Sequence, residues 1–330
     1  MSKAVALISG GLDSALAVKL MLNQGIAIQG LFLKSPFGCS TEHASAVAQH
    51  LNVPLRVVEK GEAYIDLVRN PRFGYGKNMN PCIDCRMFMF VLAKGVMEES
   101  DAQFIVTGEV VGQRPMSQQK SALGLIDHES EMEGLVLRPL SAQLLPPTLP
   151  ETEGWVDRAR LLSISGRSRK EQFQLVEEFG LKGFGAPAGG CLLTDANYSQ
   201  RLANFFEKTP HPSQTSLTLL RYGRHVELHA ENHLIVGRNQ EENETLWQIF
   251  QSASETEPMT FIRPNFPGPS AILMGHDPPE SLRQAIALIA QYAKKLGETP
   301  TVEVRYNHTV QVLPLETTQA MGVALPMVVS

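Results

Sequence analysis

Apolar and polar positions alternate in a regular way along the first half of the chain. Short apolar runs rich in β-branched residues are separated by longer stretches whose apolar positions recur every three to four residues, which predicts strands interleaved with helices. This order predicts an α/β fold, a doubly wound and mostly parallel sheet with helices on both faces. The predicted strands cover 4–9, 26–35, 54–60, 102–110 and 135–143, and the predicted helices cover 14–23, 41–50 and 85–100.

The pattern changes after the segment TPHPS at 209–213, which is rich in helix and strand breakers. We therefore expect a first domain over 1–209 and a second over 210–330. The second domain has the pattern of a smaller α+β fold. Its strands are predicted within 217–238 with a turn at 230–232, and near 260–263, 270–275 and 301–307, and its helices over 240–252 and 281–296. Two more helices are predicted before the boundary, from Arg169 onward and over 197–208.

The segment SGGLDS at 9–14 joins the first predicted strand to the first predicted helix. Glycines let the backbone approach an anion closely, and a helix start offers free N–H groups and a positive dipole end. No Gly-Lys-Ser/Thr follows, which disfavours an ordinary P-loop ATPase. A chance Gly-Gly turn is the alternative, and the strand before and helix after make a phosphate-binding loop the better interpretation.

Two further segments are expected beside this loop. Ligands of doubly wound sheets bind beyond the carboxyl ends of the strands. The segments LKSPFG at 33–38 and TGEVVGQRP at 107–115 both follow predicted strands, as SGGLDS does. The pattern therefore predicts one shared nucleotide site.

Three cysteines form a second candidate site. Cys82 and Cys85 form a C-x-x-C pair at a helix start, a position that favours thiolate over thiol, and Cys191 follows two glycines far downstream. The pair alone leaves zinc, a redox couple and an iron–sulfur cluster open. Zinc usually takes four protein ligands, whereas three cysteines leave one cluster iron open for an exogenous sulfide. The alternative is that these are small buried residues or redox bystanders. Cys39 has no partner motif and is expected to be structural.

Composition places the chain among globular proteins. It is 43% hydrophobic and 19% charged, and 330 residues suffice for two domains with a large core. The net charge of −5 is not that of a typical nucleic-acid binder. No signal peptide and no apolar stretch of ~20 residues is visible, so we expect a cytoplasmic protein without a membrane span. Four cysteines are too few for a disulfide framework.

The three motifs SGGLDS, NPCIDC and PAGGCLLTD, in this order, resemble those of the PP-loop (ATP pyrophosphatase) tRNA sulfurtransferases. Over residues 1–205 the chain is most similar to the tRNA 2-thiouridylase group and to the catalytic domain of 4-thiouridine synthetase. The resemblance implies that a nucleobase carbonyl, of uridine, is adenylated by ATP and its oxygen replaced by sulfur. It also implies ATP, Mg²⁺ and a 4Fe-4S cluster as cofactors, and tRNA and a sulfur donor as partners, the donor being inorganic sulfide or a cysteine desulfurase or carrier.

The same resemblance assigns roles to residues. Asp13, Cys85 and Cys191 would be catalytic, and Cys82, Cys85 and Cys191 would hold the cluster. In relatives that use two cysteines, one is a nucleophile and one carries a persulfide, and Cys85 and Cys191 would be that pair. The residues implied in ATP binding are Ser9, Gly10, Gly11, Asp13, Ser14, Leu33, Lys34, Ser35, Thr107 and Gly108.

The sequence also departs from the family pattern. Many thiouridylases carry Thr-Gly-His after the fourth strand, but this chain has Glu109 in the histidine's place. Gln113 and Arg114 are candidates to replace that histidine near phosphate or base. The zinc-knuckle, THUMP and rhodanese modules of some relatives are not found in this sequence.

A local basic surplus suggests where RNA would bind. Residues 156–225 contain ten Lys or Arg against six Asp or Glu, with Arg167, Arg169 and Lys170 together at a predicted helix start. Phosphate contacts fit such a cluster, but so does an ordinary solvated helix end. The segment around Arg238 resembles the NFACT-R type of domain, which is thought to bind RNA. His225, His229 and His233 are expected to be surface or paired histidines rather than a metal site.

Three alternatives remain from the sequence. The chain could be a non-thiolating PP-loop synthetase of the amidotransferase or lysidine type. It could be an ATP-gated iron–sulfur protein that binds RNA, or it could transfer sulfur to a small molecule.

Overall fold

The computed structural model describes residues 2–38, 41–182, 184, 191–229, 232–253, 257–275, 279–293, 295–296, 298–315 and 328–329. The chain divides into two compact units, Met1–Ser199 and Gln200–Ser330. This division falls inside helix α8 (Ala196–Lys208), whereas the sequence places the domain boundary just after it. Each unit has its own sheet and its own core.

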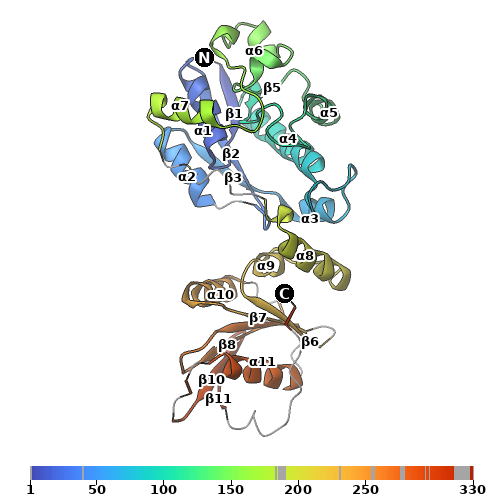
Figure 1. Ribbon diagram of the computed structural model, residues 1–330, viewed down its shortest axis with the longest axis vertical. Helices are drawn as coiled ribbons and strands as arrows, with labels where there is room; N and C mark the ends of the chain where they lie inside the picture. The colour runs from blue at the N-terminus through green and yellow to red at the C-terminus, as the bar shows by residue number, and fades with distance from the viewer. Residues whose placement is uncertain are drawn as a thin grey trace. The chain divides into compact units, whose positions relative to one another are not determined.

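The first unit is built on a five-stranded parallel sheet with the strand order β3-β2-β1-β4-β5 (Figure 1). The α/β fold with a parallel sheet is therefore confirmed. The fourth and fifth strands are shorter than predicted, because only three residues of the fourth and two residues near the start of the fifth enter the sheet ladder. The strands are β1 (Lys3–Leu7), β2 (Ala27–Lys34), β3 (Leu55–Glu59), β4 (Phe104–Val106) and β5 (Val136–Leu137).

Helices cover both faces of this sheet, as its alternating side chains require. Ala4, Ala6 and Ile8 point to a core closed by α1, α2 and α7, whereas Val5 and Leu7 point to a core closed by α4 and α5. Helices α3 and α5 were not predicted, since each presents only about three buried residues to the core. The helices are α1 (Leu12–Leu22), α2 (Thr41–His50), α3 (Gly61–Arg69), α4 (Cys82–Glu99), α5 (Lys120–Glu129), α6 (Leu149–Thr152) and α7 (Lys170–Phe179), with short 3₁₀ turns η1 (Ala142–Leu144), η2 (Arg158–Arg160) and η3 (Leu192–Thr194).

The second unit contains a separate antiparallel sheet with the order β11-β10-β8-β9-β7-β6-β12. Helix α11 packs on one face of this sheet, and α9 and α10 pack on the other. The predicted α+β class is confirmed. The elements are α9 (Gln214–Leu219), β6 (Arg224–His229), β7 (Asn232–Val236), α10 (Gln240–Ser252), β8 (Met259–Pro264), β9 (Ala271–Met274), α11 (Pro279–Gln291), β10 (Thr301–Tyr306), β11 (Thr309–Pro314) and β12 (Val328–Val329).

One predicted strand is wrong. Residues 217–219, expected to begin a strand, form the end of α9. The helix starts there because the hydroxyl of Ser213 accepts a hydrogen bond from the backbone N–H of Ser216 at 3.0 Å, which caps the first turn. It stops before Gly223, whose φ of +73° begins the turn into β6. In the described part of the chain, no helix is both long and apolar enough to cross a membrane.

Candidate active site

The predicted phosphate loop lies between β1 and α1. Its Gly10 has φ +78°, and a Cβ atom there would lie 2.6 Å from the carbonyl carbon of His43, so glycine is needed for both conformation and space. Helix α1 begins without a side-chain cap, and the hydroxyl of Ser14 instead donates to the carbonyl of Gly11 at 2.8 Å. The first N–H groups of this helix are thus positioned for an anion.

Two neighbouring strand ends complete the loop's surroundings. A Cβ atom on Gly108 would lie 2.5 Å from both the carbonyl carbon of Asp13 and the nitrogen of Ser14, so the backbone after β4 packs directly on the start of α1. Leu33 and Lys34 end β2, which pairs with β1, and the Lys34 side chain points outward to Glu59 at 2.9 Å. The residues predicted for the nucleotide site therefore lie along one edge of the sheet.

Asp13 is held in place by groups from two other elements. Its Oδ2 accepts a hydrogen bond from Gln113 Nε2 at 2.7 Å and lies 3.7 Å from the guanidinium of Arg169. Gln172 of α7 donates in turn to Gln113 at 3.1 Å. The other oxygen, Oδ1, is buried and has no hydrogen-bond partner among the described residues. A carboxylate oxygen of this kind is a suitable ligand for Mg²⁺ or for its bound water.

The four basic residues predicted to contact RNA have different surroundings. Arg167 and Lys170 are exposed, whereas Arg169 faces Asp13. Arg238 of the second unit forms an ion pair with Glu242, whose carboxylate accepts from its Nε at 2.9 Å.

The thiol of Cys85 lies against two buried side chains that the sequence did not single out. The Tyr64 hydroxyl is 3.0 Å from its Sγ atom, and Lys60 Nζ donates to the same sulfur at 3.4 Å. Lys60 also lies 3.9 Å from the centre of the Tyr64 ring, a cation–π contact. Lys60 is 8% and Tyr64 2% exposed. The only indication in the sequence was the position of Lys60, which directly follows β3.

The three cysteines differ in how easily they ionise. Burial raises the pKa of Cys85, but Lys60, the Tyr64 hydrogen bond and Arg86 outweigh it, so its pKa is lowered. Burial and the charge of Cys85 raise the pKa of Cys82, and they raise that of Cys191 to about 12. Cys85 is therefore the thiol of this site that ionises first.

The donor chemistry of the site fits an iron–sulfur cluster. The negative charges of Cys85 and Cys82 both raise the pKa of Cys191, so the C-x-x-C pair and the distant cysteine lie near one another. Thiolates are the usual ligands of such clusters. Among the described residues, no three His, Cys, Asp or Glu side chains are placed to hold a single metal ion. Cys39 and the residues 185–190 before Cys191 lie outside the described residues.

Glu109, which stands where many thiouridylases have histidine, is the centre of a buried ion network. It is 1% exposed, pairs with Arg138 at 2.9 Å and lies 3.3 Å from Arg86 of α4. Arg138 also holds Asp127 through two hydrogen bonds of 2.7 and 2.8 Å. Burial raises the pKa of Glu109, but the two arginines outweigh this effect, so its pKa is lowered. The network fixes Arg86, the residue after Cys85, beside the thiols.

The phosphate loop and the cysteines are joined through the segment after β4. Gln113 contacts Asp13, and the charge of its neighbour Arg114 lowers the pKa of Cys82. The loop after β2 adds a second link, because the carbonyl of Phe37 accepts a hydrogen bond from the N–H of Leu192 at 3.2 Å. Both candidate sites thus occupy the carboxyl edge of one parallel sheet, where ligands of such sheets bind.

In the second unit, two of the three histidines lie together. His225 Nδ1 is 2.7 Å from His233 Nε2. The sequence left open whether these histidines are paired or at the surface, and His225 is not a surface residue, because it is only 2% exposed. The side chain of His229 lies outside the described residues.

Comparison with known proteins finds one family match in each half of the chain. Residues 1–143 match the family model of the thiamine biosynthesis protein (ThiI). Residues 223–321 match that of the NFACT protein RNA binding domain. The first part of the chain is thus similar to one family and the last part to another, in line with the resemblances carried by its motifs.

Individual relatives are similar over the first half. A probable tRNA sulfurtransferase of Halobacterium salinarum is 33% identical over 146 residues, covering 41% of this chain and 35% of the relative. The tRNA-specific 2-thiouridylase MnmA of Karelsulcia muelleri is 25% identical over 174 residues, covering 48% of this chain and 45% of the relative. The chain thus spans less than half the length of these curated relatives.

A solved structure was also found. The crystal structure of a 4-thiouridine synthetase–RNA complex with bound ATP has 23% sequence identity and a TM-score of 0.39, covering 66% of this chain and 52% of that chain.

Proposed function

We propose that this chain is an ATP-dependent tRNA sulfurtransferase, which adenylates a uridine carbonyl and replaces its oxygen with sulfur. The observation that carries the proposal is the shared position of the phosphate loop and the cysteines, joined through Gln113 and Arg114. An activating site and a sulfur site at one edge are what a two-step replacement of oxygen by sulfur needs. The 33% identity over 146 residues to a probable tRNA sulfurtransferase supports the same reaction.

The activation step uses the loop after β1. The carbonyl oxygen of the base attacks the α-phosphorus of ATP, a new P–O bond forms and pyrophosphate leaves. The backbone N–H groups at the start of α1 would stabilise the charge that develops on the phosphates. Asp13 Oδ1 would hold Mg²⁺, since it is a buried carboxylate oxygen beside the loop and has no hydrogen-bond partner among the described residues.

The replacement step uses the cysteines. Sulfide attacks the activated carbon, a C–S bond forms, and AMP leaves with the former carbonyl oxygen. If a 4Fe-4S cluster is bound, Cys82, Cys85 and Cys191 would be its ligands, and its open iron would supply the sulfide. The protein groups that then matter are Lys60 and Tyr64, which keep Cys85 ionised and oriented.

The persulfide route is the second version of the same function, and the low pKa of Cys85 favours it. Here the sulfur comes from the persulfide of a cysteine desulfurase or carrier and not from inorganic sulfide: the Cys191 thiolate attacks the outer sulfur of that persulfide, and the donor's thiolate leaves. The outer sulfur of the Cys191 persulfide then attacks the activated carbon. The Cys85 thiolate then attacks the inner sulfur and forms a disulfide with Cys191, AMP leaves, and an external dithiol must reduce the disulfide.

RNA would be bound by both units. We assign phosphate contacts to the exposed Arg167 and Lys170. Arg169 would instead hold Asp13 in position. The NFACT-type domain would add a second contact, and Arg238 would take part only if its ion pair with Glu242 opens. Action in the cytoplasm stays a prediction.

The test is to incubate the full chain with ATP, sulfide and an unmodified tRNA transcript, and to measure pyrophosphate together with thiolated nucleosides by mass spectrometry. We expect both products in equal amounts. In Cys85→Ser we expect thiolation to fall at least about a hundredfold while pyrophosphate release persists, and Cys39→Ser is the matched control. Pyrophosphate without thiolated product in the wild type would favour a synthetase. Thiolation of a small molecule without tRNA would contradict the RNA substrate.

A separate measurement decides between the two sulfur routes. The protein is purified anaerobically and its absorption spectrum, iron and sulfide are measured for the wild type and Cys191→Ala. A broad iron–sulfur band that is lost in the variant supports the cluster. A colourless, iron-free and active protein leaves the Cys85–Cys191 persulfide route.

A further inference from the structure

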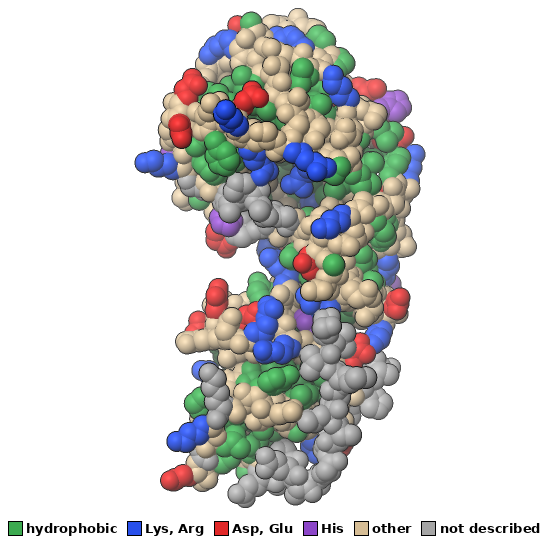
Figure 2. Space-filling view, in the orientation of Figure 1, with side chains coloured by type: hydrophobic (Ala, Val, Ile, Leu, Met, Phe, Trp, Pro, Cys, Tyr) green, Lys and Arg blue, Asp and Glu red, His purple; other side chains and the backbone are tan. Residues whose placement is uncertain are grey.

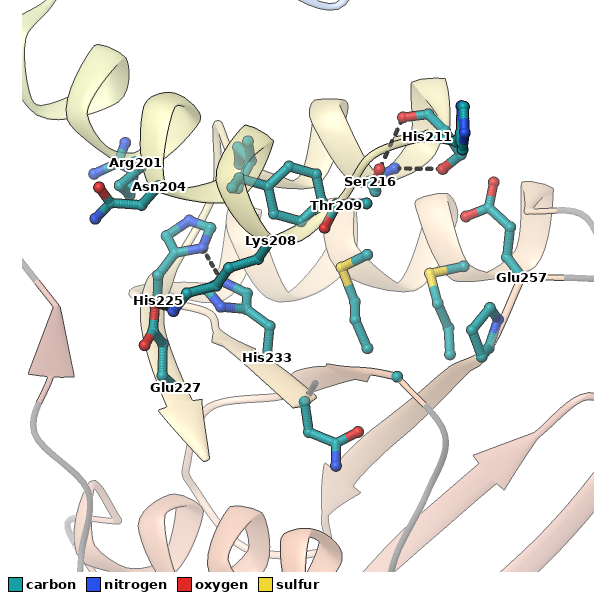
Figure 3. A pocket seen from close by; sticks show the side chains of 18 residues that line it. Arg201, Asn204, Lys208, Thr209, His211, Ser216, His225, Glu227, His233 and Glu257 are labelled. Atoms are coloured by element: carbon teal, nitrogen blue, oxygen red, sulfur yellow. Dashed lines mark hydrogen bonds and ion pairs between the residues drawn. The ribbon is translucent and has the colours of Figure 1, made fainter. Parts of the chain in front are cut away.

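The second unit contains a cavity that the proposed sulfur transfer does not use. It measures about 460 Å³, which is within the usual range for small-molecule sites. Figure 3 shows Arg201, Asn204 and Lys208 projecting from one helix over His225 and His233. That helix is α8, and all residues that line the cavity fall within 201–275, inside one unit.

A row of side chains across the sheet forms the floor of this cavity. Glu227 is opposite His233, His233 is opposite Met274, and Met274 is opposite Met259 in the strand register. Residues directly opposite in neighbouring strands project from the same face. Along the row the side chains therefore change from the carboxylate of Glu227 to the imidazole of His233 and then to the thioethers of two methionines. Phe205 of α8 also lines the cavity. Thioethers and aromatic rings pack well against flat, polarisable ligands.

The polar end of the row offers an unused hydrogen bond. His225 is 2% exposed and its Nδ1 faces His233. The backbone of Tyr222 interacts with this ring, but Nε2 has no hydrogen bond of good geometry among the described residues. When Nδ1 accepts a proton from His233 Nε2, the Nε2 atom of His225 carries a hydrogen that it can donate. A buried donor without a partner costs free energy unless a ligand satisfies it.

Two cations lie beside this donor. The charges of Arg201 and Lys208 both act on His233, and that of Arg201 also acts on His225. Lys208 forms an ion pair with Glu227 at 2.6 Å, so one carboxylate lies at this end of the cavity with the two cations. Cationic side chains next to a buried N–H donor suit a phosphate group.

We propose that this cavity binds one nucleotide unit. Its phosphate would lie toward Arg201, Lys208 and His225, and its base would pack on Met259 and Met274. The ligand could come from an RNA chain or be a free nucleotide. The proposal rests on the proposed function only in expecting RNA as its source, since the cavity chemistry is independent of sulfur transfer.

The test is a titration of the full chain labelled with ¹³C in its methionine methyl groups. The signals of Met259 and Met274 are assigned from Met259→Leu and Met274→Leu. The probes are uridine monophosphate, a short single-stranded oligouridylate and inorganic phosphate. We expect both signals to shift with the nucleotide probes and much less with phosphate alone.

Matched variants locate the contact. Arg201→Gln and Arg263→Gln each remove one positive charge from the second unit, but Arg263 is an exposed residue of β8 that does not line the cavity. We expect the dissociation constant to rise about tenfold or more in Arg201→Gln and less than about twofold in Arg263→Gln. His225→Gln, checked for an unchanged unfolding midpoint, should also weaken binding.

The outcomes separate this proposal from the sulfurtransferase. Shifts with oligouridylate alone would identify RNA as the source, and shifts with both nucleotide probes would include free nucleotides. No shift of Met259 and Met274, or an equal shift with inorganic phosphate, would overturn the proposal. The same preparations are assayed for thiolation, so that binding without thiolation, or thiolation without binding, shows which of the two proposals fails.

Discussion

The two units bury ionisable side chains in opposite ways. In the first unit Glu109 and Arg138 are almost fully buried and remain charged, because each has an oppositely charged partner. In the second unit His225 and His233 are held neutral, because burial lowers the pKa of both. Fixed charges suit a site that must stabilise phosphates and thiolates, whereas neutral imidazoles offer hydrogen bonds that a ligand can complete.

The largest expected effect comes from breaking the charged network. Arg138→Met should lower the free energy of unfolding of the first unit by about 3–5 kcal/mol, since it leaves the buried Glu109 with Arg86 alone and removes the partner of the partly buried Asp127. The control is Arg56→Met, which removes a surface pair with Glu99 and should cost less than about 1 kcal/mol. Denaturant unfolding measures both, and equal losses would contradict the comparison.

The neutral histidines predict a pH dependence of the second unit. The folded pKa of His233 is about 4, below its unfolded value of 6.5, so the unfolded state binds more protons between these values. Protonation of His233 therefore does not affect the free energy of unfolding above about pH 6.5. As the pH drops toward 4, it lowers the free energy of unfolding by roughly 3 kcal/mol. The pKa of Glu109 is lowered, so the stability from the first unit's network is lost only below about pH 4.5.

The measurement uses the fluorescence of Trp247, which packs against Phe250 and Phe261 in the second unit. Trp155→Phe removes the other tryptophan, so the signal reports only on this unit. His233→Gln should flatten the dependence between pH 6.5 and 5. An unchanged slope in that variant would show that other groups cause the loss.

The phosphate loop predicts a matched pair of glycine variants. Gly108→Ala should lower ATP turnover by about a hundredfold or more, because its Cβ would collide with the backbone of Asp13 and Ser14. Gly124→Ala in α5 meets open space and should leave turnover unchanged, with a stability gain of about 0.5–1 kcal/mol. Steady-state pyrophosphate release compares them, and similar activity would argue against phosphate binding at this loop.

The smallest effect concerns the thiolate. Lys60→Met removes the cation that lies 3.4 Å from Cys85, so the pKa of that thiol should rise. A rise of about one unit lowers the thiolate fraction at neutral pH about tenfold, and alkylation of Cys85 should slow by that factor. Lys94→Met, on the exposed side of α4, is the control. Mass spectrometry of the alkylated peptide gives the rates.

The sequence predicted the parts of the molecule that are local. The SGGLDS loop, the C-x-x-C helix start and the parallel strands are each contiguous patterns with their own physical reason. The structure has the turn between β1 and α1, its five parallel strands overlap the predicted segments, and phosphate binding at that turn stays a prediction. Lys60 and Tyr64 could not be assigned to Cys85 in this way, because packing of α3 on α4 brings them there. The row from Glu227 to Met259 depends on strand register, which a single sequence does not specify.

The central claim is that ATP activates a carbonyl oxygen of the RNA base. The most direct measurement uses a tRNA transcript whose uridine carbonyl oxygens carry a heavy isotope, incubated with the full chain, ATP and sulfide. The account predicts that the label appears in AMP in the same amount as sulfur in the tRNA. Unlabelled AMP, with the label retained in the RNA, would mean that ATP is hydrolysed by water and would contradict the account.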